Sequence, residues 1–156
     1  MNKKIGVLLP FKDNFTCSKA GSASIWIKDF NRKSSYKKDI YVCGNTDNLK
    51  DLIEKKNYLN IKLSDSNFQS KNKLYIDEFI KLNSKYKFKL IEVHNRPSYI
   101  HRLIKKEINS KLVLIFHNNP LNLGGSKTVE ERNILIEKCE KLIFVSNWVK
   151  EKFFEG

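Results

Sequence analysis

Short apolar runs alternate with segments of helical periodicity along most of the chain. Nearly continuous apolar runs predict buried strands at residues 5–9, 39–43, 89–93, 112–116 and 142–145, and weaker alternation predicts a short strand at 58–63. Between them, apolar residues recur at helical spacing in a helix from about Ser22, a short helix at 49–53, and a helix marked by Ile76 and Tyr86. Residues 64–72 are polar and predict a loop.

The second half of the chain carries clear helix-start signals. Pro97 suits the first position of a helix. Thr128 and Glu131 have the spacing of a capping box, and Ser146 can cap a last helix that carries Trp148. Apolar strands separated by amphipathic helices indicate a parallel sheet covered on both faces. We therefore predict one domain, residues 1–156, with an α/β, Rossmann-like, three-layer, doubly wound fold.

The composition is that of an ordinary globular domain. Hydrophobic residues make up 40% and charged residues 30% of the 156 residues, which argues against global disorder. The apolar run near the N-terminus is too short for a signal peptide and no run is long enough to span a membrane, so we expect a cytoplasmic protein. Cys17, Cys43 and Cys139 lack metal-ligand spacing, and we expect them to be buried or half-buried hydrophobic residues.

The net charge of +13 leaves several partners open. A basic surface attracts nucleic acid, anionic membranes or phosphorylated substrates. Here the excess is nearly all lysine, with only four arginines, and no aromatic-basic reading motif is present, so nucleic acid is not expected. Peripheral contact with the inner face of the membrane through the basic surface stays open.

Unusual polar residues follow the predicted strands directly. His94 and Asn95 follow the strand at 89–93, His117 and Asn118 follow 112–116, and Ser146 follows 142–145. The loop after the first strand ends at Gly21, where a helix starts. In a parallel sheet these loops share one edge, where ligands of open α/β sheets bind. Such an edge suits an anionic or sugar-like ligand.

Each of these residues also has a structural interpretation. A histidine after a strand can bond a neighbouring carbonyl, the asparagines and Pro120 suit a turn, and Ser146 suits a helix cap. We expect His101 to be solvated within a helix. The lone glycine at Gly21 falls short of a dinucleotide fingerprint, and no metal site is indicated. Their shared placement is what favours a binding site.

Three segments resemble the N-terminal domain of glycosyltransferase family 4, retaining enzymes of the GT-B fold. They are V-H-N-R-P at 93–97, I-F-H-N-N-P at 115–120, and the stretch 130–153, which contains F-V-S-N-W-V-K. The resemblance implies a domain that binds the acceptor, while a second domain binds the nucleotide-sugar donor as co-substrate, with no further cofactor. It implies that His117 is the catalytic candidate near the transferred sugar. His94, Asn95, Asn118, Gly21 and Ser146 become candidate substrate-binding residues.

The loop at Gly21 lacks the family's paired glycines, which argues against a donor-phosphate role there. The sequence ends at Gly156, approximately where the first domain of such an enzyme finishes, without the donor domain. We therefore expect the acceptor-binding half of a transferase acting on a cell-surface polysaccharide or lipid-linked glycan. Its partners would be that acceptor and a donor domain, which can be a separate chain. The alternatives are a non-catalytic carbohydrate- or phosphate-binding module and, less favoured, a basic nucleic-acid-binding protein.

Overall fold

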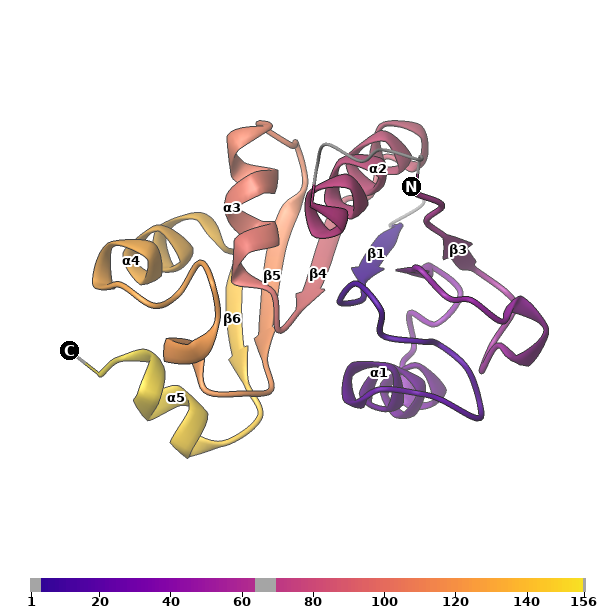
Figure 1. Ribbon diagram of the computed structural model, residues 1–156, viewed down its shortest axis with the longest axis horizontal. Coiled ribbons are helices and arrows are strands. Elements are labelled where there is room, and N and C mark those ends of the chain that lie inside the picture. The colour runs from indigo at the N-terminus through magenta and orange to yellow at the C-terminus, as the bar shows by residue number, and fades with distance from the viewer. Residues whose placement is uncertain (1–3, 64–69, 156) are drawn as a thin grey trace.

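A parallel β-sheet forms the centre of the computed structural model, which describes residues 4–63 and 70–155 (Figure 1). Within these residues the sheet has six strands in the order β3-β2-β1-β4-β5-β6, all parallel. β1 and β4 lie side by side in the middle, although α1, β2, β3 and α2 separate them in sequence (Figure 1). The predicted Rossmann-like α/β fold is confirmed. The strands are β1 (Ile5–Leu8), β2 (Ile40–Gly44), β3 (Tyr58–Asn60), β4 (Leu90–His94), β5 (Lys111–Phe116) and β6 (Lys141–Phe144).

The helices cover the two faces of the sheet unequally. α2, α3, α4 and α5 pack on one face, where they contribute Phe79, Ile100, Leu135 and Phe153 to a common hydrophobic core. α1 packs on the opposite face, and its Ala23 and Ile27 join a smaller core with residues of β1 and β2. The helices are α1 (Ser22–Lys33), α2 (Lys71–Tyr86), α3 (Pro97–Lys105), α4 (Val129–Lys138) and α5 (Asn147–Phe153), with short 3-10 helices η1 (Leu49–Asp51) and η2 (Pro120–Asn122).

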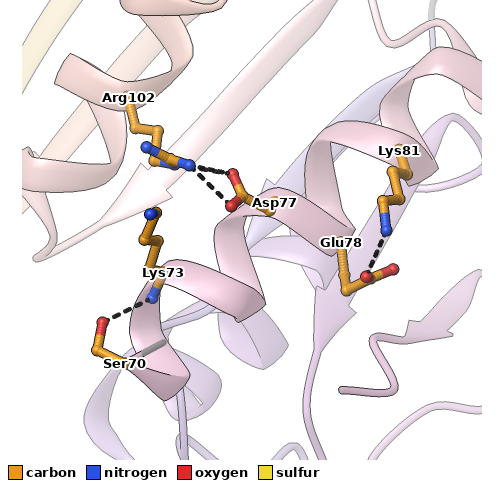
Figure 2. Close-up of polar contacts among 6 residues, drawn as sticks. All are labelled: Ser70, Lys73, Asp77, Glu78, Lys81 and Arg102. Atoms are coloured by element: carbon orange, nitrogen blue, oxygen red, sulfur yellow. Dashed lines mark hydrogen bonds and ion pairs between the residues drawn. The ribbon is translucent and has the colours of Figure 1, made fainter. Parts of the chain in front are cut away.

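A bidentate ion pair fastens α3 to α2. Arg102 donates hydrogen bonds from Nε and Nη2 to the two carboxylate oxygens of Asp77, at 2.8 and 2.7 Å. Figure 2 shows this pair between the two helices. It also shows Ser70, which caps the start of α2 by accepting a hydrogen bond from the backbone N–H of Lys73.

Two predicted elements end earlier than the pattern suggests. The strand predicted at 58–63 pairs only as far as Asn60, because its partner β2 ends at Gly44. The short helix predicted at 49–53 is a single 3-10 turn, η1. There the Asp51 carboxylate accepts hydrogen bonds from both the backbone N–H and the hydroxyl of Ser18, which ties the turn to the loop before α1.

The predicted loop at 64–72 needs a correction at its end. Residues 64–69 lie outside the described residues, but 71 and 72 are helical, because Ser70 caps α2 one residue earlier. The capping box of Thr128 and Glu131 and the cap by Ser146 are confirmed. Of the cysteines, Cys43 is buried and Cys139 half-buried as expected, whereas Cys17 is exposed, contrary to expectation. No helix among the described residues is long and apolar enough to cross a bilayer.

Candidate functional site

A cleft of about 330 Å³ opens where the strand order reverses, between the loops that follow β1 and β4. This is the place at which open α/β sheets bind ligands. A larger hollow of about 410 Å³ lies at the opposite, amino-terminal edge of β4 and β5, among surface lysines and the ends of α2 and α3. The cleft is lined by Pro10, Phe11, Lys12, Asp13, Gly21, Ser22, Ala23, Asn95, Arg96, His117 and Asn118.

One wall of the cleft is the start of α1, and the chain's own Asp13 carboxylate sits against it. Asp13 Oδ1 accepts hydrogen bonds from the backbone N–H of Gly21 at 3.2 Å and from the hydroxyl of Ser24 at 2.6 Å. A Cβ on residue 21 would lie only 2.6 Å from that carboxylate, which explains the glycine. Anions bind at helix N-termini, but here the Asp13 carboxylate lies beside the first turn of α1, and its negative charge disfavours a second anion there. The geometry therefore argues against a donor-phosphate role for Gly21.

Asn95 joins the loops that follow β4 and β5. Its backbone has a φ of 54°, a left-handed conformation that asparagine tolerates better than most residues. Its backbone N–H donates to the carbonyl of Ile115 at 2.8 Å. Its side-chain oxygen accepts hydrogen bonds from the backbone N–H groups of His117 at 3.3 Å and Asn118 at 3.2 Å. Asn95 therefore holds the two loops that carry most of the predicted site residues in one arrangement.

A chain of three polar side chains runs from the sheet to the cleft. Glu92 and His94 are two residues apart in β4 and so lie on the same face of the sheet. The Glu92 carboxylate lies 2.7 Å from Nε2 of His94, and Nδ1 of His94 lies 3.0 Å from Nε2 of His117. The side chain of His94 is fully buried, that of Glu92 is 13% exposed, and His117 is half-buried at the wall of the cleft.

The surroundings of His117 favour its neutral form. Burial, followed by the neighbouring His94, lowers the pKa of His117 from 6.5 to about 4, and the Glu92 carboxylate opposes this only in part. Trp26 of α1 packs edge-on against both imidazoles, with ring centroids 5.2 Å from His94 and 6.2 Å from His117. At neutral pH, His117 therefore contributes hydrogen bonding to the cleft rather than a positive charge.

The charged groups at the cleft are of both signs. Lys12, Asp13 and Arg96 all line it. The Arg96 guanidinium donates from Nη1 to the carbonyl of Asn95 at 2.9 Å, so part of its bonding capacity serves the loop. Lysine and arginine are hydrogen-bond donors only, and Oδ1 of Asp13 is engaged by Gly21 and Ser24. The cleft thus offers a ligand the donors of Lys12 and Arg96, together with His117.

The structure brings four of the six predicted site residues to the cleft. Gly21, Asn95, His117 and Asn118 line it, whereas His94 lies behind His117 with no exposed side-chain surface for direct ligand contact. Ser146 is exposed after β6, where its hydroxyl accepts a hydrogen bond from the backbone N–H of Val149, and it does not line the cleft.

His101, expected to be solvated, is half-buried instead. Its Nε2 lies 2.7 Å from the carbonyl of Gly125, and the backbone N–H of Ser98 donates to the carbonyl of Gly124 at 3.0 Å. Since a carbonyl only accepts, the His101 nitrogen must carry the hydrogen. These contacts dock the loop after β5 onto the first turns of α3, so His101 has a structural role and is not part of the cleft lining.

Sequence reasoning missed Glu92, Asp13 and Trp26 as parts of the site. Glu92 could have been identified from the sequence, because it is a carboxylate inside the apolar run K-L-I-E-V, two residues before a histidine. Charged groups are rarely placed in such a strand without a partner. Asp13 and Trp26 had no comparable signal, since their contacts depend on how the first loop and α1 fold over the sheet.

Comparison with models of known protein families gives no match, and no curated protein matches the chain.

Proposed function

We propose that this chain is the acceptor-binding half of a retaining glycosyltransferase of the GT-B type. The observation that carries the proposal is the position of His117 and Asn118 at a cleft over the point where the strand order reverses. Two of the three segments that resemble family 4, at 93–97 and 115–120, supply the cleft residues from β4 and β5. The third, at 130–153, forms α4, β6 and α5 beside them.

The chemistry of the cleft suits a ligand rich in hydroxyl groups. Lys12, Arg96 and the side-chain amide of Asn118 can donate hydrogen bonds to sugar oxygens. His117, neutral at physiological pH, bonds to a sugar without attracting a phosphate by charge. The Asp13 carboxylate lies beside the N-terminus of α1 and repels a second anion there, so the diphosphate of a nucleotide sugar would be held mainly by a donor domain. The resemblance implies the same arrangement, in which one domain binds the acceptor and a second domain binds the donor.

The proposed partners are a glycan acceptor and a donor domain. The acceptor is a cell-surface polysaccharide or a lipid-linked glycan, and the donor domain either continues the polypeptide or is a separate chain. For a lipid-linked acceptor, the net charge of +13 would draw the domain to an anionic leaflet. Binding to anionic vesicles that fades as salt is raised, with no binding to neutral vesicles, is the expected result. Equal binding to both would contradict this contact.

The test of the proposal is sugar transfer by this chain together with its donor domain. We expect His117→Ala to lower kcat/KM roughly fivefold, the worth of one hydrogen bond of about 1 kcal/mol. His101→Gln is the matched control, because it replaces a histidine outside the cleft lining with a side chain that can still donate to Gly125. Unchanged turnover in a folded His117→Ala protein would refute the role of His117. Saturable glycan binding without any turnover would favour the non-catalytic binding module.

A further inference from the structure

The ring of His117 is hydrogen-bonded on one side only. Its Nε2 faces Nδ1 of His94, while its Nδ1 has no hydrogen bond to the described residues. Among buried side-chain nitrogen and oxygen atoms of those residues, only Asn31 Oδ1 lacks a partner, so Nδ1 of His117 is not buried. Since His117 lines the cleft, this nitrogen is the part of the ring left for a ligand.

With Glu92 ionised and His94 neutral, the order of groups in the chain fixes where the hydrogens lie. An ionised carboxylate accepts hydrogen bonds and cannot donate them, so Nε2 of His94 must carry the hydrogen that points to Glu92. In a neutral His94, Nδ1 is then an acceptor, and the hydrogen in the 3.0 Å contact must come from Nε2 of His117. A neutral His117 that is protonated at Nε2 has a free lone pair at Nδ1.

We propose that Glu92 and His94 are positioning residues that hold His117 in the Nε2–H tautomer, so that its Nδ1 accepts a hydrogen bond from a ligand hydroxyl in the cleft. The lowered pKa of His117, caused chiefly by burial, keeps this lone pair available at neutral pH. The identity of the hydroxyl as a sugar hydroxyl rests on the proposed function. The tautomer itself does not.

With this tautomer the cleft presents a hydrogen-bond acceptor, Nδ1 of His117, as well as hydrogen-bond donors. Lys12 and Arg96 can only donate, and Oδ1 of Asp13 already accepts from Gly21 and Ser24. Nδ1 of His117 adds an uncharged acceptor to these donors. A hydroxyl can donate to it and accept from a neighbour at the same time, whereas a fully ionised phosphate oxygen can only accept. The cleft should consequently select a hydroxyl over a phosphate at this point.

The tautomer can be measured on the wild-type chain by NMR of the imidazole nitrogens. The chain has three histidines, so the spectrum holds few signals, and His101→Gln and His117→Gln variants assign them. At about pH 8, above the ordinary imidazole pKa, we expect His117 to show a protonated Nε2 and an unprotonated Nδ1. His101, which donates from Nε2 to Gly125, serves as an internal reference for the same tautomer. A hydrogen on Nδ1 of His117 would overturn the proposal.

A charge-removing variant tests the role of Glu92. In Glu92→Gln the amide can donate to Nε2 of His94, which allows the reverse order of hydrogens along the chain. We expect His117 to become a mixture of tautomers, visible as a shift of both ring nitrogens. Glu140→Gln is the matched control, since Glu140 pairs with Lys111 at the surface, and it should leave both signals in place. If the signals do not move in a folded Glu92→Gln protein, Glu92 does not set the tautomer of His117.

Titration with two simple probes tests the ligand class. Methyl α-glucoside should move the Nδ1 signal of His117 saturably. Sulfate, which like a fully ionised phosphate has no hydrogen to donate, should not. A shift with sulfate alone, or none with glucoside up to its solubility, would overturn the assignment of a hydroxyl to Nδ1. The tautomer is measured without a donor domain and without sugar transfer. The tautomer assignment can therefore be wrong while sugar transfer occurs, and it can be right while no transfer occurs, so the two failures are distinguishable.

Discussion

Replacing Asn95 with alanine should destabilise the protein and loosen the two loops that build the cleft. The substitution removes an amide oxygen that accepts hydrogen bonds from the backbone N–H groups of His117 and Asn118. It also places a residue with poor tolerance for the left-handed region at a φ of 54°. The site is 8% exposed, so water can replace the lost contacts only in part.

The expected magnitude is the sum of these two effects. Two hydrogen bonds are worth about 1 kcal/mol each. A left-handed backbone costs alanine about 1 kcal/mol that asparagine largely avoids. The free energy of unfolding should therefore fall by about 3 kcal/mol, a large part of the typical 5–15 kcal/mol but not all of it.

Urea denaturation followed by tryptophan fluorescence measures this change, with the midpoint falling and the slope unchanged. Asn95→Asp is the matched control, because aspartate keeps the acceptor oxygen and tolerates the same backbone. We expect it to remain within about 0.5 kcal/mol of the wild type at neutral pH, the range of harmless substitutions. If the alanine variant were as stable as the wild type, or the aspartate variant as unstable as alanine, the proposed role of the amide oxygen would be wrong.

Three further substitutions or conditions test other parts of the structure. Gly125→Ala should cost at least about 2 kcal/mol, because Gly125 has a φ of 93° and a Cβ would lie 2.6 Å from the backbone nitrogen of Ser98; Gly124→Ala, with open space around it, should change the urea midpoint little. Thr128→Ala removes the N-cap of α4 and should lower the free energy of unfolding by about 1 kcal/mol in the same assay. Because the pKa of His117 is lowered from 6.5 to about 4, the unfolded chain takes up a proton that the folded protein refuses between these values, so stability should fall as pH falls through this window. His117→Gln should lose this component of a stability–pH profile, and an unchanged profile would contradict the low pKa.

Local sequence patterns predict much of the fold. The apolar runs, Pro97, and the pair of Thr128 and Glu131 mark elements that depend on neighbours a few residues away, and the structure has all of them. The unequal covering of the two sheet faces could not be predicted, because a helical stripe shows that a helix is buried but not on which face. The early end of β3 depends on where β2 stops, which its own sequence does not contain.

At the site, too, some positions could be predicted from neighbouring residues, whereas others depend on contacts between residues that are far apart in the sequence. His117 and Asn118 could be placed at the sheet edge because each follows a strand directly. The shared face of Glu92 and His94 follows from their spacing, but their contact with His117 requires the register of β4 against β5, in which His94 lies opposite Ile115. Asp13 reaches Gly21 only after the loop between them has folded back, so its position beside the N-terminus of α1 could be found only in the structure.

Chemical-shift mapping of glycan binding on the isotopically labelled chain tests the central claim most directly, namely that the ligand binds in the cleft at the carboxyl edge of the sheet. Titration with oligosaccharides should move the backbone amide signals of Gly21, Arg96 and Asn118 together and saturably, and Asn95→Ala should weaken the response. Shifts that gather instead around the larger hollow at the amino-terminal edge, near Asn83 and Ser110, would contradict the account.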